Sequence, residues 1–549
     1  MRRILRGLAV AVIAAAAPEA PGIFESVARA QAVDPVIFNV NSILSSGERQ
    51  SLPIENERLD LLRYYTSNDA RPLFIEADGA TSRARGLIAR MIDAEYDGLD
   101  PHAYPIEFLE DLVSEADNAP PERLAEIEIW FAAHFLRYAA DLKVGRVLPR
   151  MVYPDLYMPR KDIDGAAVLE VVPKFPDLYA FFEAWEPLNI EYDNLRKALA
   201  EYLEIRDEGG WGVIGPGPDV AAGERDPRIV QLRQRLDSEY GFESAYGDEP
   251  DVLDTELEKR LRNFQLHNDV PVTGALDKTT LLALNVPVER RIEQIMLSME
   301  RLRWMPEEIS DQVLIANKGD GVLRLLTPEG AAREWRILPN CPRENLALVA
   351  GNMRSMVLNP PWNVPFDYFQ TNLYPELTRD PSVVAEQGYE LLYQDTAMPL
   401  SALPWKQIPR STLSKEKEKF KFRLRPGMHN PYGRYIYRLN GIDDAFLFDA
   451  PPETLDEFCD PRLPKGAIAV VDGLDLMDEL VTRRLGPADF LERTIARHET
   501  LIVPDVKPLP VMIVFQSAWV DANGNIRFSK DPYLEDLRLT KALEGKVQS

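Results

Sequence analysis

Apolar residues recur at three-to-four spacing through the first part of the chain. One series is typical of a single buried helix face and comprises Leu124, Ile127, Phe131, Phe135, Tyr138 and Leu142. His134 lies beside this stripe, which favours a core or boundary position over a ligand role. The pattern predicts a mostly helical region over residues 33–220. Its end is a Gly- and Pro-rich stretch from Gly209 to Pro216, which predicts a linker.

A small helical module is predicted next, over residues 221–286. Leu257, Leu261 and Phe264 fit one helix face. Gly274 suits a tight turn before Asp277, whose carboxylate can cap the following helix. Pro287 fits the first turn of a further helix over 288–303, so residues 287–311 are expected to connect the module to the C-terminal part of the chain.

From Gln312 the period changes from helix to strand. Residues 313–316, 322–326 and 333–338 are short, apolar segments divided by Gly, Asn and Pro, as strands are. Residues 366–428 interrupt them with helical and loop sequence. Residues 509–519, a turn at 521–524 and a return strand over 525–530 predict a final hairpin. The chain is therefore expected to be a multidomain α+β protein with a β-rich domain over 312–540 and a tail over 541–549.

The composition narrows the classes of partner. A chain of 549 residues with 45% hydrophobic residues is long enough for about three domains with real cores. Its formal net charge of -25 argues against nucleic acid and against charge-driven binding to anionic membranes.

The N-terminus predicts export. Arg2, Arg3 and Arg6 precede a short apolar run, and a small-x-small cleavage site ends at Ala32. Residues 1–32 are therefore interpreted as a signal peptide, and the protein as periplasmic. An uncleaved anchor is the alternative, although the apolar run is short for a bilayer span. No later stretch is apolar enough to predict an integral membrane span.

Cysteine and histidine positions give little support for a cofactor. Cys341 and Cys459 are the two cysteines, and they could pair in an oxidising compartment, but the sequence leaves their distance open. The five histidines are scattered without metal-ligand spacing, so no metal and no cofactor is expected.

Several phrases carry a family resemblance that covers roughly residues 55–540. They are residues 97–104, 135–146, 229–236, 272–285, 355–365 and 426–437. These phrases resemble the large periplasmic L,D-transpeptidases. The resemblance implies a scaffold domain over 33–220, a peptidoglycan-binding-like module over 221–286, and a transpeptidase-like domain whose insertion at 366–428 resembles a lid.

Enzymes of that family break an amide in a peptidoglycan stem peptide through a cysteine thiolate, which a histidine activates. The resemblance places Ala467 at the cysteine position, Phe448 at the histidine position and Ala469 at an arginine position. A methyl group has no lone pair with which to attack, and a benzyl ring cannot accept a proton.

We therefore expect a catalytically inactive L,D-transpeptidase homologue that binds peptidoglycan stem peptides or an envelope protein, or that acts as a scaffold for an active enzyme. Its expected groove comprises Gly466, Lys465, Arg462, Trp362 and Asn363. The alternative is an active cross-linking enzyme with a relocated thiol, Cys459, eight residues before Ala467, for which His429 is the nearest histidine. For Arg462, a structural ion pair is an equal alternative.

Overall fold

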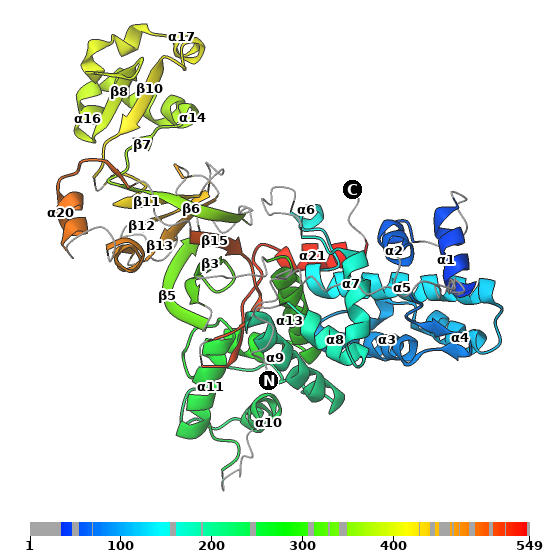
Figure 1. The fold of residues 1–549 in the computed structure, drawn as a ribbon. Coiled ribbons are helices and arrows are strands. Elements are labelled where there is room, and N and C mark those ends of the chain that lie inside the picture. The colour runs from blue at the N-terminus through cyan, green and yellow to red at the C-terminus, as the bar shows by residue number, and fades with distance from the viewer. Residues whose placement is uncertain are drawn as a thin grey trace, which may run out of the picture.

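A computed structural model describes most of the chain (Figure 1). The described residues are 35–46, 54–67, 70–153, 161–187, 190–241, 249–305, 312–327, 330–339, 349–427, 429–439, 445–449, 462–463, 466–471, 473–482, 489–503, 509–521 and 523–545. The predicted signal peptide, Cys341, Cys459 and Lys465 lie outside them.

The N-terminal helices surround one long central helix, α5 (Pro121–Val144). The others are α1 (Pro35–Ser45), α2 (Arg58–Tyr65), α3 (Ser82–Ile92), α4 (Ile106–Ala116), α7 (Gly165–Val171), α8 (Leu178–Trp185) and α9 (Ile190–Asp207). The predicted apolar stripe of α5 is buried along its whole length. His134 is also buried, and its Nδ1 lies 2.8 Å from the carbonyl oxygen of Trp130, as expected for a core histidine.

Helices α10 (Arg228–Tyr240), α11 (Thr255–His267) and α12 (Lys278–Leu284) form a small module with its own core. Asp277 caps α12 by accepting a hydrogen bond of 2.8 Å from the backbone N–H of Thr280. The next helix, α13, runs over Val288–Arg303 as predicted. Its Ile292, Ile295 and Met299 share one core with α9 and with the first strand of the β-rich domain.

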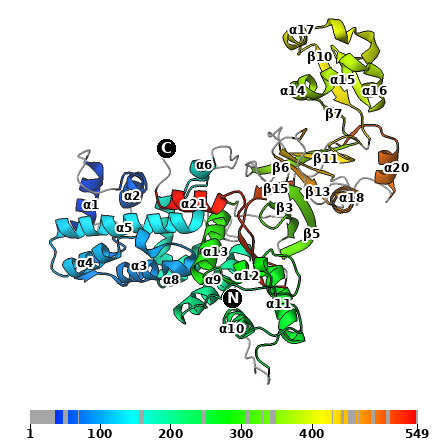
Figure 2. The same ribbon diagram turned by 180° about the vertical axis from the view of Figure 1, so that it is seen from behind.

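The β-rich domain is a closed barrel (Figure 2). The sheet order is β11-β12-β13-β5-β4-β3-β15-β6-β14, and an additional pairing of β11 with β6 closes it. The strands are β3 (Val313–Asn317), β4 (Val322–Thr327), β5 (Gly330–Pro339), β6 (Val349–Leu358), β11 (Tyr435–Leu439), β12 (Ala445–Asp449), β13 (Gly466–Val470), β14 (Leu501–Val503) and β15 (Leu509–Val514).

The chain leaves the barrel after β15 through the predicted hairpin. Strands β16 (Ala518–Val520) and β17 (Ile526–Phe528) are antiparallel, and helix α21 (Glu535–Leu543) follows them. This last helix packs on α13 and on α6 (Pro149–Val152), so the end of the chain returns to the N-terminal helices. Among the described residues, no helix combines the length and the hydropathy needed to cross a bilayer.

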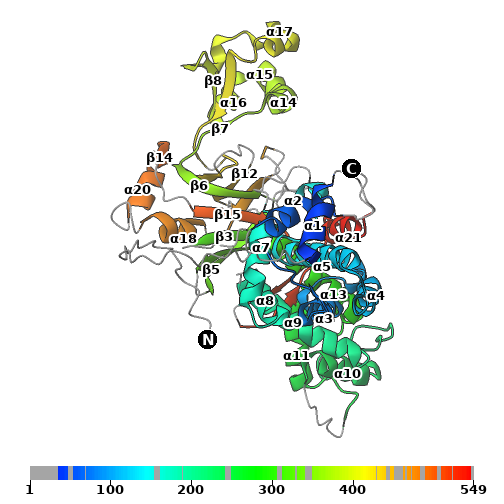
Figure 3. The same cartoon turned by 45° about the vertical axis from the view of Figure 1, so that its right-hand side comes forward.

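The segment between β6 and β11 folds as a unit that projects from the barrel (Figure 3). Its sheet has the order β7-β10-β8-β9, with β7 (Trp362–Asn363), β8 (Tyr389–Tyr393), β9 (Thr396–Met398) and β10 (Phe420–Leu424). Helices α14 (Phe366–Tyr368), α15 (Tyr374–Arg379), α16 (Pro381–Glu386) and α17 (Arg410–Lys415) complete it. We call residues 362–424 the lid, after the lid-like insertion that the resemblance implied over residues 366–428.

The sequence predicted helix and loop in this insertion and missed its strands. Phe420 to Leu424 alternates more and less buried residues, and Phe422 stacks on Phe369 with ring centroids 4.1 Å apart. Strand β10 comes directly after a run of alternating Lys and Glu. This charged run made the short alternation of apolar residues in the strand hard to recognise in the sequence. The lid therefore has a hydrophobic core of its own, which includes Trp362, Leu391 and Trp405.

The turn between β3 and β4 predicts a measurable pH dependence. The Asp320 side chain is 4% exposed, and this burial raises the pKa of its carboxyl to about 6 although Arg324 pairs with it. Because the folded state then holds the proton more tightly than the unfolded state, Asp320 lowers the unfolding free energy as the pH rises from about 4 to 6, by up to about 3 kcal/mol.

Asp320→Asn removes this titration. Urea unfolding at several pH values measures the unfolding free energies of the wild type and the variant. We expect the wild-type value to fall relative to the variant's value as the pH rises from about 4 to 6. A difference that stays constant with pH would contradict the raised pKa.

Candidate functional site

The two positions that the family resemblance assigns to catalysis lie on neighbouring strands. Strands β12 and β13 are parallel, with Phe446 opposite Ala467 and Phe448 opposite Ala469. Successive side chains of a strand point to opposite faces of the sheet. Leu447, Ile468 and Val470 belong to the core inside the barrel, whereas Phe446, Phe448, Ala467 and Ala469 belong to a second cluster on the outer face.

This outer cluster is apolar and closed to solvent. Phe448, Ala467 and Ala469 are each 0% exposed, and Val357, Ile436 and Leu463 complete the buried set. The Phe446 ring lies 6.0 Å from that of Phe448 and 5.2 Å from that of Tyr432, edge to face in both cases. Hydrocarbon groups therefore fill the positions where acyl transfer would need a thiolate and an imidazole.

A cysteine placed at position 467 should be unreactive. Thiolates react and thiols do not, and burial among hydrocarbon groups favours the thiol. We expect Ala467→Cys to be labelled by iodoacetamide at least 100-fold more slowly in the folded protein than in urea, as measured by peptide mass spectrometry. Asn363→Cys, at an exposed position, is the matched control. Rapid labelling of the folded Ala467→Cys variant at this position would show that the outer cluster opens.

The predicted groove residues are partly brought together. The guanidinium of Arg462 lies 5.9 Å from the centre of the Trp362 ring, and its Nη1 donates a hydrogen bond of 3.2 Å to the carbonyl oxygen of His429. Trp362 is buried, whereas Asn363 is exposed beside Arg423 of β10. Gly466 begins β13 and is buried opposite Ala445.

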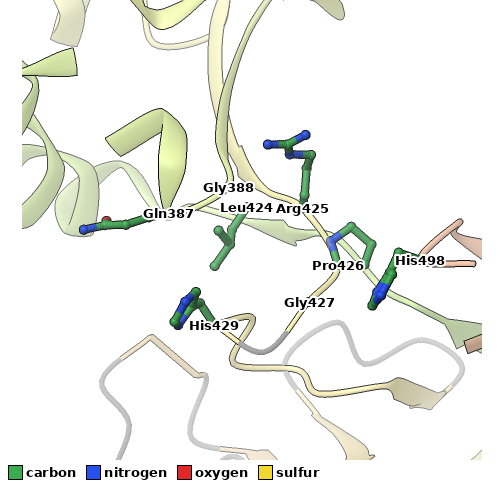
Figure 4. Close-up of a pocket in the computed structure, with 8 residues that line it drawn as sticks. All are labelled: Gln387, Gly388, Leu424, Arg425, Pro426, Gly427, His429 and His498. Carbon is green, nitrogen blue, oxygen red and sulfur yellow. The ribbon is translucent and has the colours of Figure 1, made fainter. Parts of the chain in front are cut away.

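A cavity of about 370 Å³ lies where the lid joins the barrel (Figure 4). It is lined by Gln387, Gly388, Leu424, Arg425, Pro426, Gly427, His429 and His498. His429 and His498 lie on opposite sides of the connection through Pro426 and Gly427, and the Arg425 side chain points away from both. The two imidazoles therefore do not converge on one point, and among the described residues no group of three His, Cys, Asp or Glu side chains could hold a metal ion.

An ion pair that the sequence did not single out fixes the end of β12. Asp449 is 3% exposed and accepts hydrogen bonds from the guanidinium of Arg434, with Nη2 at 2.9 Å from Oδ1. Gly433 has φ +63°, and a Cβ atom there would collide with the backbone of Asp449. The acid after Phe448 and the Gly-Arg pair before β11 were visible in the sequence, but the strand pairing that joins them was not.

Comparison with known proteins gives two domain matches. Residues 60–199 match the "Scaffold domain" family, and residues 225–284 match the "Putative peptidoglycan binding domain" family. A "Putative L,D-transpeptidase" of Haemophilus influenzae is 22% identical over 253 residues, which are 46% of this chain and 49% of the relative. The chain therefore aligns with about half the length of this curated relative.

These domain matches define a protein built from a scaffold domain and a peptidoglycan-binding domain ahead of a β-rich domain. Together with the relative, they support the resemblance to the L,D-transpeptidase family that the sequence predicted.

Proposed function

We propose that this protein is a catalytically inactive member of the L,D-transpeptidase family that acts in the cell envelope, in the periplasm, and modulates cell-wall remodelling. One observation carries the proposal: Phe448 and Ala467, at the positions that the resemblance assigns to the catalytic histidine and cysteine, are fully buried in one hydrocarbon cluster. Acyl transfer from an amide needs a nucleophile and a proton shuttle at the reacting carbonyl. Neither side chain can supply them.

Peptidoglycan is the binding partner that the domain match at residues 225–284 supports. The surface around Arg462, which lies beside the buried Trp362 ring and the His429 backbone, is the second binding surface of the proposal, for a stem peptide or for an envelope protein. The net charge of -25 disfavours electrostatic attraction to anionic wall polymers and favours a protein at this second surface.

The test is a turnover assay with purified protein and tetrapeptide muropeptides, followed by mass spectrometry. We expect no cross-linked product, no released D-alanine and no thioester. Sedimentation with purified sacculi measures wall binding separately, and we expect the protein in the pellet. Turnover by the wild-type protein would overturn the assignment of inactivity.

The second candidate function is acyl transfer through Cys459. It is favoured by the presence of a thiol eight residues before Ala467 and by the proximity of Arg462 to the His429 backbone. Cys459→Ala should then abolish turnover, and a thiol-acylating β-lactam should label Cys459. A Cys341–Cys459 disulfide in the mature protein would exclude this candidate.

A further inference from the structure

Buried arginines in this protein share one property. Those less than a tenth exposed, among the described residues, are Arg90, Arg233, Arg235, Arg291, Arg301, Arg303 and Arg324. All but Arg291 form an ion pair with a carboxylate, respectively Asp97, Asp254, Glu239, Asp536, Glu300 and Asp320. This is the ordinary rule, because an unpaired buried charge is costly.

Arg291 breaks the rule. Its guanidinium donates to the amide oxygens of Asn268 at 2.5 Å and Gln294 at 2.9 Å, and it lies 4.4 Å above the Phe528 ring. These partners are all neutral, and Nε has none among the described residues. The guanidinium therefore has no carboxylate in direct contact within the described part of the chain.

The electrostatics of Arg291 agree with this geometry. Burial lowers its pKa to about 10, whereas the pKa values of Arg301 and Arg303, which have carboxylate partners, are raised. Glu239 acts on Arg291 from a longer distance, but its carboxylate already pairs with Arg235 at 2.7 Å. An anion placed beside Arg291 would supply the counter-charge that its buried neighbours have.

A cavity of about 410 Å³ lies beside this guanidinium. Arg291 and Gln294 of α13 form one wall, and Val270, Leu282, Ala283 and Val286 of the small module form an apolar wall. The third side is the segment after β17, Ser529–Asp531. This volume falls within the lower range of small-molecule sites.

The opening carries charges of both signs. Arg290, Lys530 and a single acid, Asp531, line the cavity, and Arg290 already pairs with Glu293 at 2.6 Å and with Asp536 at 3.0 Å. The Asp531 carboxylate already accepts the backbone N–H groups of Glu535 and Asp536, each at 2.8 Å, at the start of α21. A cavity with one apolar wall and a buried cation that contacts no carboxylate among the described residues is complementary to an anion that carries an aliphatic group.

We propose that this cavity binds a small aliphatic carboxylate, of the size of an amino acid or a dipeptide, with Arg291 as its counter-ion. The planar guanidinium suits a carboxylate, which offers two oxygens in one plane. The aliphatic body lies against Leu282 and Val286. Such a ligand joins the module, α13 and the segment after β17, so its binding stabilises their packing. The proposal does not depend on peptidoglycan binding by the module.

The test is isothermal titration calorimetry on the full-length protein with three probes. They are N-acetylalanylalanine, the same dipeptide with its C-terminus amidated, and inorganic phosphate. We expect the free carboxylate to bind at least tenfold more tightly than the amide, and to raise the melting temperature further with each increase in its concentration above the Kd. Equal binding of the acid and the amide would overturn the proposal. Phosphate binding as tight as that of the dipeptide would also overturn it, because the site would then select a simple inorganic anion and not an aliphatic carboxylate.

Two variants locate the ligand. Leu282→Glu puts a negative charge at an exposed position of the cavity wall, and we expect it to weaken carboxylate binding at least tenfold. Leu266→Glu, also exposed on the module but outside the cavity, is the matched control and should bind as the wild type does. Arg291→Gln should remove binding and, because it removes an unpaired charge, leave the melting temperature of the ligand-free protein within a few degrees of the wild type.

Unchanged binding by Leu282→Glu would sink the proposal even if Arg291→Gln does not fold. Sacculus sedimentation by these variants is expected to be unchanged, which separates this site from wall binding.

Discussion

Replacing Glu128 by alanine is expected to lower the unfolding free energy of the helical scaffold by about 4–6 kcal/mol. Glu128 lies in α5, is 0% exposed, and accepts four hydrogen bonds. Its donors are the hydroxyl of Tyr65 at 2.5 Å and the backbone N–H groups of Leu73, Phe74 and Ile75 at 2.6, 2.9 and 2.9 Å. The alanine variant leaves these buried donors unsatisfied, at about 1–3 kcal/mol each before the structure relaxes.

Hydrogen-exchange mass spectrometry checks this result directly. The amides of Leu73–Ile75 should exchange far faster in Glu128→Ala, and the urea midpoint of the scaffold should fall. Glu122→Ala, exposed on the same helix, should change the unfolding free energy by no more than about 0.5 kcal/mol. Unchanged protection at 73–75 would mean that these amides find other acceptors.

Asp536→Ala is expected to release the C-terminal helix, at about 3–5 kcal/mol. The Asp536 carboxylate is 0% exposed, lies 2.9 Å from Arg301 and 3.0 Å from Arg290, both on α13, and accepts the Ser517 hydroxyl at 3.0 Å. The adjacent Glu535 lies 3.6 Å from the buried Lys318 of the barrel. Removing Asp536 leaves Arg301 buried without its counter-charge, which is the costly part of the change.

Limited proteolysis near residue 534 and the thermal midpoint both report on this helix. We expect faster cleavage in Asp536→Ala and a lower midpoint. Lys541→Ala changes an exposed residue of the same helix and should resist cleavage as the wild type does. Equal cleavage rates in all three proteins would show that α21 is held by its apolar side alone.

Much of the fold could be predicted from local sequence patterns. Three features were predicted correctly: the buried stripe of α5, the helix that starts after Pro287 and the hairpin at Asp521–Gly524. Each depends on residues that are close together in the sequence, through apolar spacing, the fixed φ of proline or turn-forming residues. The structure confirmed the fold class, and the two domain matches and the relative supported the family resemblance.

Interactions between distant segments could not be predicted. Glu128 interrupts an apolar stripe, but nothing near it indicates that Leu73–Ile75 need an acceptor 53–55 residues away. Arg291 follows another arginine on an amphipathic helix, where the usual outcome is exposure to solvent. Phe448 and Ala467 were named from resemblance, whereas their common face depends on a parallel pairing of distant strands that no local pattern encodes.

The way the lid joins the barrel has a consequence for its origin. Its first and last strands are hydrogen-bonded neighbours, with Trp362 opposite Leu424 and Asn363 opposite Arg423. A segment whose two ends meet in this way can be inserted or deleted as one unit. A short turn that joins Pro361 directly to Arg425 would leave the pairing of β6 with β11 in register. Recombination could therefore exchange this piece among related genes without redesigning the host domain.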